Sequence, residues 1–324
     1  MVKELELQNF KSFIFEKMTL SQLTLFAGLN SSGKSSVLQA IRIFSDWFVG
    51  RQPLRQWNTL KSNLSVDKFF SITIDGLTVR LDSDVERSEG PSPIPFEYVH
   101  ISADRQGPQD AYVLDAALPS VEIGKNGRHV YAYLEKNAAK QVSSKLAIAP
   151  NNVRLLKPNV EAWLQIVSPG VSMEKEIDLK QDEVHPYFNG IRPTETGYGL
   201  SYVLPVIVAL VAPLEPGTVI MIENPEAHLH PRGQVEMGKL IGLSVASGKQ
   251  VLVETHSEHI VDGIRLSVRK DRLNSDDVMM YYFERKDYET PSSVQKISVT
   301  QDGRLSMWPA GFFDQSIVDK RELL

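Results

Sequence analysis

Residues 28–35 read GLNSSGKS, which is a complete match to the pattern G-x-x-x-x-G-K-[ST]. Residues 23–26, just before this segment, alternate apolar and polar as a short strand would. Residues 35–48, just after it, carry apolar side chains at helical spacing. A strand, a glycine-rich loop and a helix form the context that a phosphate-binding loop requires. The sequence therefore predicts such a loop near the start of the chain.

The residue types in this loop suit a nucleoside triphosphate. Glycines permit a tight turn in which successive backbone N–H groups point at the phosphates, and the helix start adds partial positive charge. Lys34 adds a full charge, and Ser35 adds a hydroxyl for Mg²⁺. The expected nucleotide-binding residues are Asn30, Ser31, Ser32, Gly33, Lys34, Ser35 and Ser36.

The composition excludes several classes of site. The net charge of the 324 residues is -5, so any contact with nucleic acid would have to come from a local basic patch. There is no cysteine, which excludes disulfides, thiolate zinc sites and cysteine nucleophiles and suits a reducing cytosol. Residues 1–11 lack the apolar core of a signal peptide, and the apolar run 202–213 is too short to cross a bilayer. We therefore expect a soluble, cytoplasmic protein.

Apolar runs alternate with helical patterns along the chain. Strands are expected at 96–102, 218–222, 249–255, 278–283 and 294–299, and helices at 159–167, 202–211 and 231–246. Hairpins are expected at Asp75-Gly76 and at Asp302-Gly303, and residues 109–190 are expected to be mixed, mainly helical structure. Strands that alternate with helices predict a largely parallel α/β sheet.

Two later strands end in groups that can act on a nucleotide. The apolar residues 219–222 lead into Glu223, and an acid at the end of such a strand can hold Mg²⁺ through water. Residues 251–254 lead into Thr255 and His256, which would put an imidazole where a γ-phosphate sits.

A further motif, GYGLS at residues 197–201, places glycines and a serine at a helix start. Such a start is an anion site without a lysine. Gly199, Leu200 and Ser201 are therefore candidates to contact a phosphate that a partner presents.

In this order, the phosphate loop, the glycine–serine signature, the acid strand and the Thr-His pair resemble the ABC-type ATPases. The resemblance is strongest to the RecF, SMC and OLD branch, through ENPEAHLHP at 223–231 and THS at 255–257. LQNFKSF at 7–13 and WPAGFFDQ at 308–315 are similar to small bacterial AAA/ABC-class ATPases with a C-terminal domain of unknown function. Members of that group often occur in phage-defence loci. The resemblance covers residues 1–50, 96–108 and 193–324.

The resemblance implies an α/β P-loop NTPase fold with a mostly parallel sheet, an antiparallel β subdomain and a mixed helical insert. Residues 1–324 would form one ABC-type head with its core at 1–50 and 193–290. Residues 51–192 would be an insert with a β-hairpin and a mixed helical lobe, and 291–324 a β-rich tail.

The resemblance also implies roles for single residues. ATP and Mg²⁺ would be the cofactors, with Lys34 and Ser35 on phosphate and metal and Glu223 as the metal-binding acid. His256 would be the switch histidine, and the signature would complete the nucleotide site of a second protomer in a head-to-tail dimer. Arg105 or Gln106 would form a loop that senses Mg²⁺ or phosphate.

One residue departs from the family pattern. The residue after the acid is usually the catalytic glutamate, and here it is Asn224, whose amide cannot accept a proton. Either Glu226 serves as the base, or hydrolysis is slow and the protein is a nucleotide switch. The alternative for Glu226 is a purely structural role as an acid at a helix start, where the helix dipole favours a negative charge.

Two functions remain open on this basis. One is an ATPase whose ATP-dependent dimer drives or licenses a partner, either DNA or a separately encoded effector such as a nuclease. The other is a regulatory subunit that barely hydrolyses. The histidines at 228, 230, 256 and 259 do not have the spacing of a zinc site, and no nuclease-type carboxylate cluster follows the ATPase motifs.

Overall fold

The computed structural model describes residues 1–49, 57–82, 85–89, 96–114 and 122–323. Parts of the expected insert, residues 51–56, 83–84, 90–95 and 115–121, lie outside the described residues. The chain divides into two compact units, Met1–Tyr98 with Ser275–Leu324, and Val99–Asn274. We call them unit 1 and unit 2 and describe each by itself.

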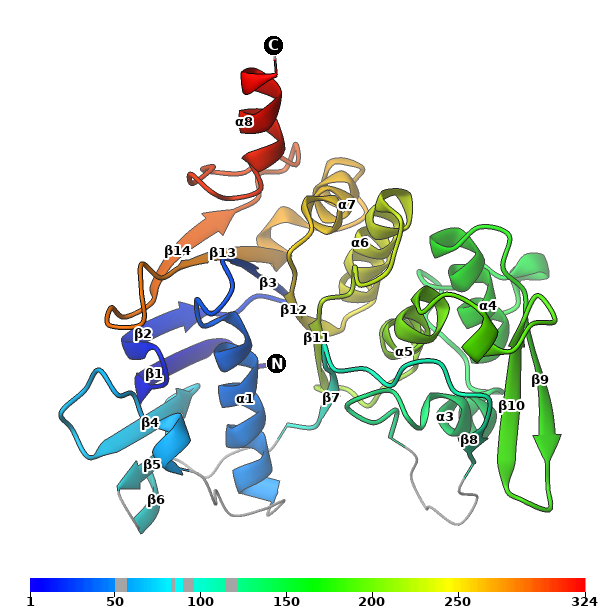
Figure 1. Ribbon diagram of the computed structural model, residues 1–324, viewed down its shortest axis with the longest axis horizontal. Coiled ribbons are helices and arrows are strands. Elements are labelled where there is room, and N and C mark those ends of the chain that lie inside the picture. The colour runs from blue at the N-terminus through cyan, green and yellow to red at the C-terminus, as the bar shows by residue number, and fades with distance from the viewer. Residues whose placement is uncertain (50–56, 83–84, 90–95, 115–121, 324) are drawn as a thin grey trace. The chain divides into compact units, whose positions relative to one another are not determined.

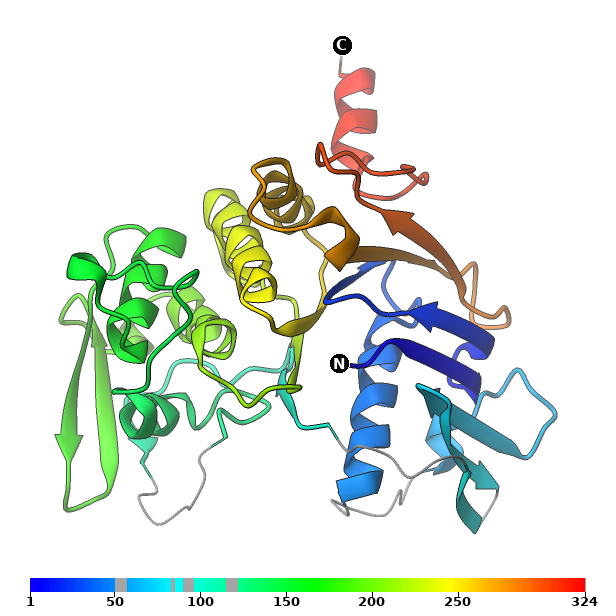
Figure 2. The same ribbon diagram turned by 180° about the vertical axis from the view of Figure 1, so that it is seen from behind.

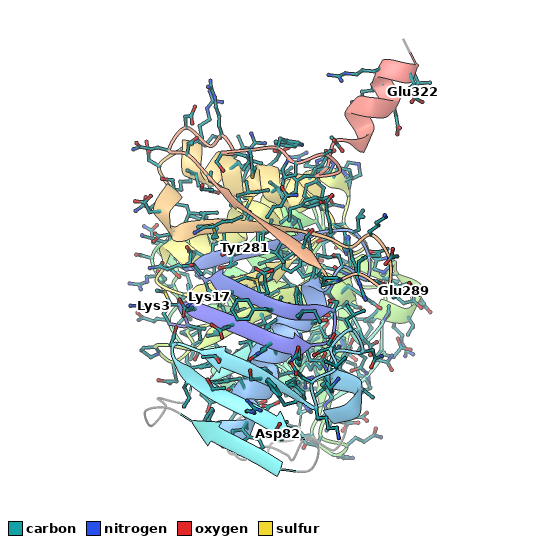
Figure 3. The ribbon with its side chains drawn as sticks, turned by 90° about the vertical axis from the view of Figure 1, so that its left-hand side faces the viewer. Lys3, Lys17, Asp82, Tyr281, Glu289 and Glu322 are labelled. Carbon is teal, nitrogen blue, oxygen red and sulfur yellow. The ribbon has the colours of Figure 1, made fainter. Side chains whose placement is uncertain are left out.

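Unit 1 contains an antiparallel sheet with the strand order β2-β1-β4-β5-β6. Its strands are β1 (Glu4–Phe10), β2 (Phe13–Thr19), β4 (Phe69–Ile74), β5 (Leu77–Asp82) and β6 (Val85–Glu89). The turn expected at Asp75-Gly76 is present, and these residues have φ 50° and 83° between β4 and β5. Lys11 has φ 50° in the turn between β1 and β2. Figure 3 shows these strands side by side, with Lys17 on β2 and Asp82 at the end of β5. Because β4 pairs with β1, the hairpin at 69–82 belongs to the N-terminal sheet rather than to the mixed lobe.

The second strand group of unit 1 carries the phosphate loop. Strand β3 (Leu23–Gly28) pairs in parallel with β13 (Val278–Glu284), which pairs antiparallel with β14 (Ser293–Ser298). Helix α1 (Lys34–Val49) follows the loop, and the short helix α2 (Trp57–Leu60) comes later. Phe26 stacks on Tyr281 and meets Phe283 edge-on, so aromatic packing fixes β3 against β13.

The C-terminal tail of unit 1 is mixed rather than β-rich. The expected turn at Asp302-Gly303 is present, with Thr300 N–H bonded to the Arg304 carbonyl. Phe312 is buried against Tyr282, and the chain then forms helix α8 (Gln315–Glu322), which stands out from the strands of this unit in Figure 1. The polar sequence of α8 has no apolar stripe, so its pattern did not predict a helix.

The core of unit 2 is built on short buried strands and three helices. Strand β11 (Val219–Glu223) pairs in parallel with β12 (Gln250–Glu254), and β7 (Tyr98–Ile101) lies beside β11. The helices are α5 (Gly199–Val211), α6 (Pro231–Ala246) and α7 (Glu258–Arg269). Figures 1 and 2 show α6 and α7 side by side. Their backbones approach so closely that a Cβ on Gly238 would lie 2.4 Å from the Ile260 carbonyl oxygen.

The rest of unit 2 is the mixed lobe. It contains α3 (Val130–Asn137), α4 (Leu156–Val167), β8 (Tyr112–Val113) and a hairpin of β9 (Met173–Asp178) and β10 (Glu183–Phe188). Short 3-10 turns lie at Pro150–Asn152 and Pro193–Glu195, and another begins unit 1's C-terminal part at Ser275–Asp277. The helix expected at 159–167 is confirmed, whereas the β9–β10 hairpin was not predicted. Among the described residues, no helix is long and apolar enough to span a membrane.

Candidate functional site

The phosphate loop of unit 1 has the geometry that its sequence predicts. The loop connects β3 to α1, and Lys34 is the first residue of that helix. The Lys34 ammonium folds back and donates to the carbonyl oxygens of Gly28 (3.0 Å) and Leu29 (2.7 Å). Its side chain is only 3% exposed, so the charge sits against the loop backbone rather than in solvent. This position lets the ammonium meet an anion that enters the loop.

Two glycines in this loop are required by close contacts. Gly28 has φ 140°, and a Cβ there would lie 2.1 Å from the Phe283 carbonyl oxygen. Gly33 has φ 108°, and a Cβ there would lie 2.6 Å from the ring of Phe13. Ser31 also has positive φ (61°). A side chain at Gly28 or Gly33 would therefore force this loop to shift.

The polar side chains of the phosphate loop differ in their surroundings. Asn30, Ser31 and Ser35 are exposed, and Ser36 is half-buried. Ser32 is fully buried, and its hydroxyl donates to the Leu29 carbonyl (2.7 Å). Ser32 therefore supports the loop with its side chain, which leaves its backbone as the part that can serve a ligand.

Glu223 ends β11 in unit 2 and is held by two donors. Its Oε1 lies 2.9 Å from Nε2 of His100, and its Oε2 accepts the Ala103 N–H (3.0 Å). Because a carboxylate only accepts, the imidazole donates from Nε2. Burial by itself would raise the pKa of Glu223, but these hydrogen bonds outweigh it, so the pKa lies below the ordinary value. Glu223 is therefore ionised at neutral pH.

The donors present fit Mg²⁺. No group of three His, Cys, Asp or Glu side chains that could cage a metal ion occurs in the described part of the chain. Mg²⁺ keeps several waters and takes its remaining ligands from phosphates and one or two protein oxygens. Taken separately, Glu223 of unit 2 offers an ionised carboxylate of that kind, and Ser35 of unit 1, an exposed residue, offers a hydroxyl.

Residues 223–228, which we call the acid turn, begin with the last residue of β11. Asn224 adopts φ 47°, and its N–H donates to the Glu254 carbonyl (2.8 Å) at the end of β12. Asparagine tolerates this left-handed conformation better than most residues. The Oδ1 atom of Asn224 is buried and has no hydrogen-bond partner among the described residues.

Glu226 connects the acid turn to the end of β12. Its Oε2 accepts the Thr255 hydroxyl and its Oε1 accepts the His256 N–H, each at 2.7 Å. Burial raises the pKa of Glu226 although both hydrogen bonds oppose this. The interpretation of Glu226 as a helix-start acid is wrong, because the next helix, α6, begins at Pro231.

Arg105 lies behind the acid turn instead of facing solvent. Its Nη1 donates to the Glu223 carbonyl (2.8 Å) and its Nη2 to the Asn224 carbonyl (2.6 Å). The residue is 3% exposed, and desolvation lowers its pKa to about 10, with Glu226 opposing the shift. It therefore stays charged at neutral pH. Gln106, the other candidate for a sensor, is half-buried, and its N–H donates to the Asn126 carbonyl (2.8 Å).

The signature residues form the start of α5. Gly199 is its first residue, and no side chain caps this helix start. A Cβ on Gly199 would lie 2.9 Å from the His228 carbonyl oxygen, so the signature packs on the acid turn. Leu200 is half-buried, and Ser201 is 7% exposed, so its hydroxyl is not displayed on the surface of unit 2.

Unit 2 thus brings together Glu223, Asn224, Glu226 and Arg105. The His256 N–H is bonded to Glu226, and His256 itself is an exposed residue. The loop residues 30–36 lie together in unit 1. Sequence reasoning missed His100, although it is the one imidazole in the strand YVHI. It also missed Tyr202, whose ring lies 5.4 Å from the Arg105 guanidinium carbon.

Comparison with solved structures shows the fold. The SmcHead bound to the C-winged helix domain of ScpA matches with a TM-score of 0.57 at 15% identity, covering 92% of this chain and 98% of that chain. The SMC head domain from Thermotoga maritima matches with a TM-score of 0.51 at 15% identity, covering 92% and 99%. An Smc head domain with an extended coiled coil bound to the C-terminal domain of ScpA, from Pyrococcus furiosus, matches with a TM-score of 0.55 at 12% identity, covering 99% of both chains. The expected α/β fold of an ABC-type head is therefore confirmed.

Comparison with sequence families shows the class. Residues 273–323 match a protein family of unknown function, DUF3696, in agreement with the expected C-terminal domain. No curated protein matches the chain. The AAA ATPase domain model matches residues 1–81 and 132–261, more than half of the chain. The protein therefore belongs to the AAA ATPase domain family.

Proposed function

We propose that the protein binds ATP with Mg²⁺ at the phosphate loop and hydrolyses it. The observation that carries the proposal is the position of Lys34, a nearly buried ammonium directed at the carbonyls of its own glycine loop. The membership of the AAA ATPase domain family and the fold of SMC heads support it.

Each group has a role in this proposal. Lys34 and the backbone of residues 30–36 bind the β- and γ-phosphates. Ser35 would supply a hydroxyl to Mg²⁺, Glu223 is the acid that the resemblance assigns to the metal, and the metal would neutralise charge on the phosphates. Glu226, whose pKa is raised, accepts the proton of the attacking water. His256 comes two residues after the end of β12, its N–H donates to Glu226, and it acts as the switch residue.

Lys34→Ala tests the binding site. The substitution removes charge-assisted contacts to phosphate worth about 1.5–3 kcal/mol each, so ATP should bind at least about a hundredfold more weakly. The control is Lys17→Ala, because Lys17 carries the same charge in unit 1 but is exposed and paired with Glu4. Titration calorimetry with Mg-ATP measures both variants. Equal ATP affinity in Lys34→Ala and the wild type would contradict the proposal.

A slow nucleotide switch is the second candidate, and Asn224 favours it. Its amide stands where the family has a catalytic glutamate, and its buried Oδ1 accepts no hydrogen bond from the described residues. If the protein is such a switch, Asn224→Glu should turn hydrolysis on, whereas an ATPase that uses Glu226 should gain little from it. Single-turnover rates of the two proteins distinguish the candidates.

We further propose a head-to-tail dimer that forms on ATP. The uncapped start of α5 leaves the first N–H groups of the helix available for a phosphate, and Tyr198 just before it is 56% exposed. Sedimentation should show more dimer with Mg-ATP than without it. Ser201→Arg and Tyr198→Arg should prevent this gain, and Leu179→Arg, on a residue 87% exposed in the same unit, should not. A dimer of equal stability without nucleotide would contradict the proposal.

We propose that this cycle drives or licenses a partner in bacterial phage defence. Two of the similar SMC heads were solved with a domain of ScpA bound, which supports a protein partner. The resemblance to ATPases of defence loci favours a separately encoded effector such as a nuclease, with DNA as the alternative. Co-purification with the products of neighbouring genes, with and without Mg-ATP, tests for the effector, and a gel-shift assay tests for DNA.

A further inference from the structure

The backbone of the acid turn depends on Arg105. Asn224 takes a left-handed conformation, which points the Glu223 and Asn224 carbonyls at the same guanidinium. The planar fork of an arginine can donate to two successive carbonyls at once, and a lysine cannot. Arg105 also donates to the Ser102 carbonyl (3.3 Å), which ties its own segment to the same group.

Arg105 is in turn held by the signature helix. Tyr202 lies in the first turns of α5, and its ring stands 5.4 Å from the Arg105 guanidinium carbon. The same ring meets the His228 ring edge-on at 4.7 Å. His228 also lies 5.7 Å from the ring of Tyr198, just before the helix. The Tyr202 ring therefore contacts both Arg105 and His228, the last residue of the acid turn.

We propose that Arg105 is a positioning residue for hydrolysis and that Tyr202 couples it to the signature helix. Arg105 fixes the peptides at Glu223 and Asn224, and so sets where the Glu223 and Glu226 carboxylates point. Movement of the first turn of α5 shifts Tyr202 and therefore Arg105. The inference rests on the proposed ATPase function, but it concerns contacts within unit 2 that exist without nucleotide.

Hydrogen exchange of the nucleotide-free protein tests whether Arg105 holds the backbone of the acid turn. Arg105→Ala should speed exchange at the Asn224 and Ala227 amides, which are bonded within the acid turn and to Glu254, by at least about tenfold. The amides of β11 should exchange as in the wild type. Arg128→Ala removes the same charge from an exposed position in unit 2 and should change neither. Unchanged exchange in the acid turn of Arg105→Ala would overturn the proposal.

Kinetics test the role in hydrolysis. Arg105→Ala should lower kcat for ATP at least about tenfold while KM changes less than about threefold, and Arg105→Lys should recover part of the loss. Tyr202→Leu, which leaves Arg105 in place, should lower kcat in the same direction, and Tyr202→Phe, which keeps the ring, should match the wild type. Faster exchange with an unchanged kcat would overturn the inference and leave the ATPase function intact. A wild type that hydrolyses no ATP would instead remove the proposed function, while the exchange experiment would still decide whether Arg105 holds the acid turn.

Discussion

Replacing Glu226 with glutamine or with alanine separates the two roles of this carboxylate in unit 2. Structurally, Glu226 joins the acid turn to the end of β12, because its two oxygens accept the Thr255 hydroxyl and the His256 N–H. Chemically, its raised pKa suits it to accept a proton. Glutamine keeps the shape and one acceptor, whereas alanine removes both acceptors.

The contacts set the size of each effect. In Glu226→Gln the amide oxygen still accepts the His256 N–H, and the amide nitrogen donates to the Thr255 hydroxyl, which must turn its own hydrogen away. That exchange should cost less than about 1 kcal/mol of the free energy of unfolding. Glu226→Ala leaves both donors without their acceptor and should cost about 2–3 kcal/mol. If Glu226 is the base, both variants should lose at least about a hundredfold in turnover while still binding ATP.

Denaturant unfolding and single-turnover hydrolysis, measured on both variants, distinguish the roles. The reasoning predicts a stable but inactive glutamine variant and an unstable, inactive alanine variant. A glutamine variant with wild-type turnover would refute Glu226 as the base. An alanine variant as stable as the wild type would refute the structural role of Glu226 in joining the acid turn to the end of β12.

Two further predictions concern stability. Gly28→Ala should destabilise unit 1 by at least about 2 kcal/mol, because its Cβ would lie 2.1 Å from a backbone oxygen. The control is Gly76→Ala, at a residue with positive φ but with nothing within 4 Å of its Cβ, which should cost about 1 kcal/mol in the same unfolding assay. The Glu223 and Glu226 carboxylates should make contributions to folding stability with opposite pH dependence. The lowered pKa of Glu223 gives stability that is present above its unfolded pKa and lost as the pH falls through its folded pKa. The raised pKa of Glu226 gives stability that is present below its unfolded pKa and lost as the pH rises through its folded pKa. The stability deficit of Glu223→Gln should therefore shrink in acid and that of Glu226→Gln should grow, in metal-free unfolding curves; deficits that follow the same direction would contradict the assignment.

Local patterns predicted most of the elements and the phosphate loop. The glycine spacing and Lys34 define the loop within eight residues, and the expected helix at 231–246 matches α6. The β9–β10 hairpin was missed because its strands, MEKEID and EVHPYF, are charged, and Pro186 in β10 is unusual within a paired strand.

The contacts of the candidate site could not be predicted in the same way, because their partners are distant in sequence. His100 meets Glu223 across 123 positions, and Arg105 meets the Glu223 carbonyl across 118. Nothing in the local pattern of residues 96–106 shows that Arg105 turns inward to the acid turn rather than outward as a sensor. The pattern located the residue and not the direction of its side chain.

The central claim is that this chain hydrolyses ATP. A single-turnover measurement tests it most directly: excess protein is mixed with radiolabelled ATP and Mg²⁺, alone and with co-purifying partners, and released phosphate is followed for the wild type and Lys34→Ala. We predict phosphate release by the wild type and its loss in Lys34→Ala. Release at the same rate by both proteins, or bound ATP that stays intact in the wild type under every condition, would contradict the account.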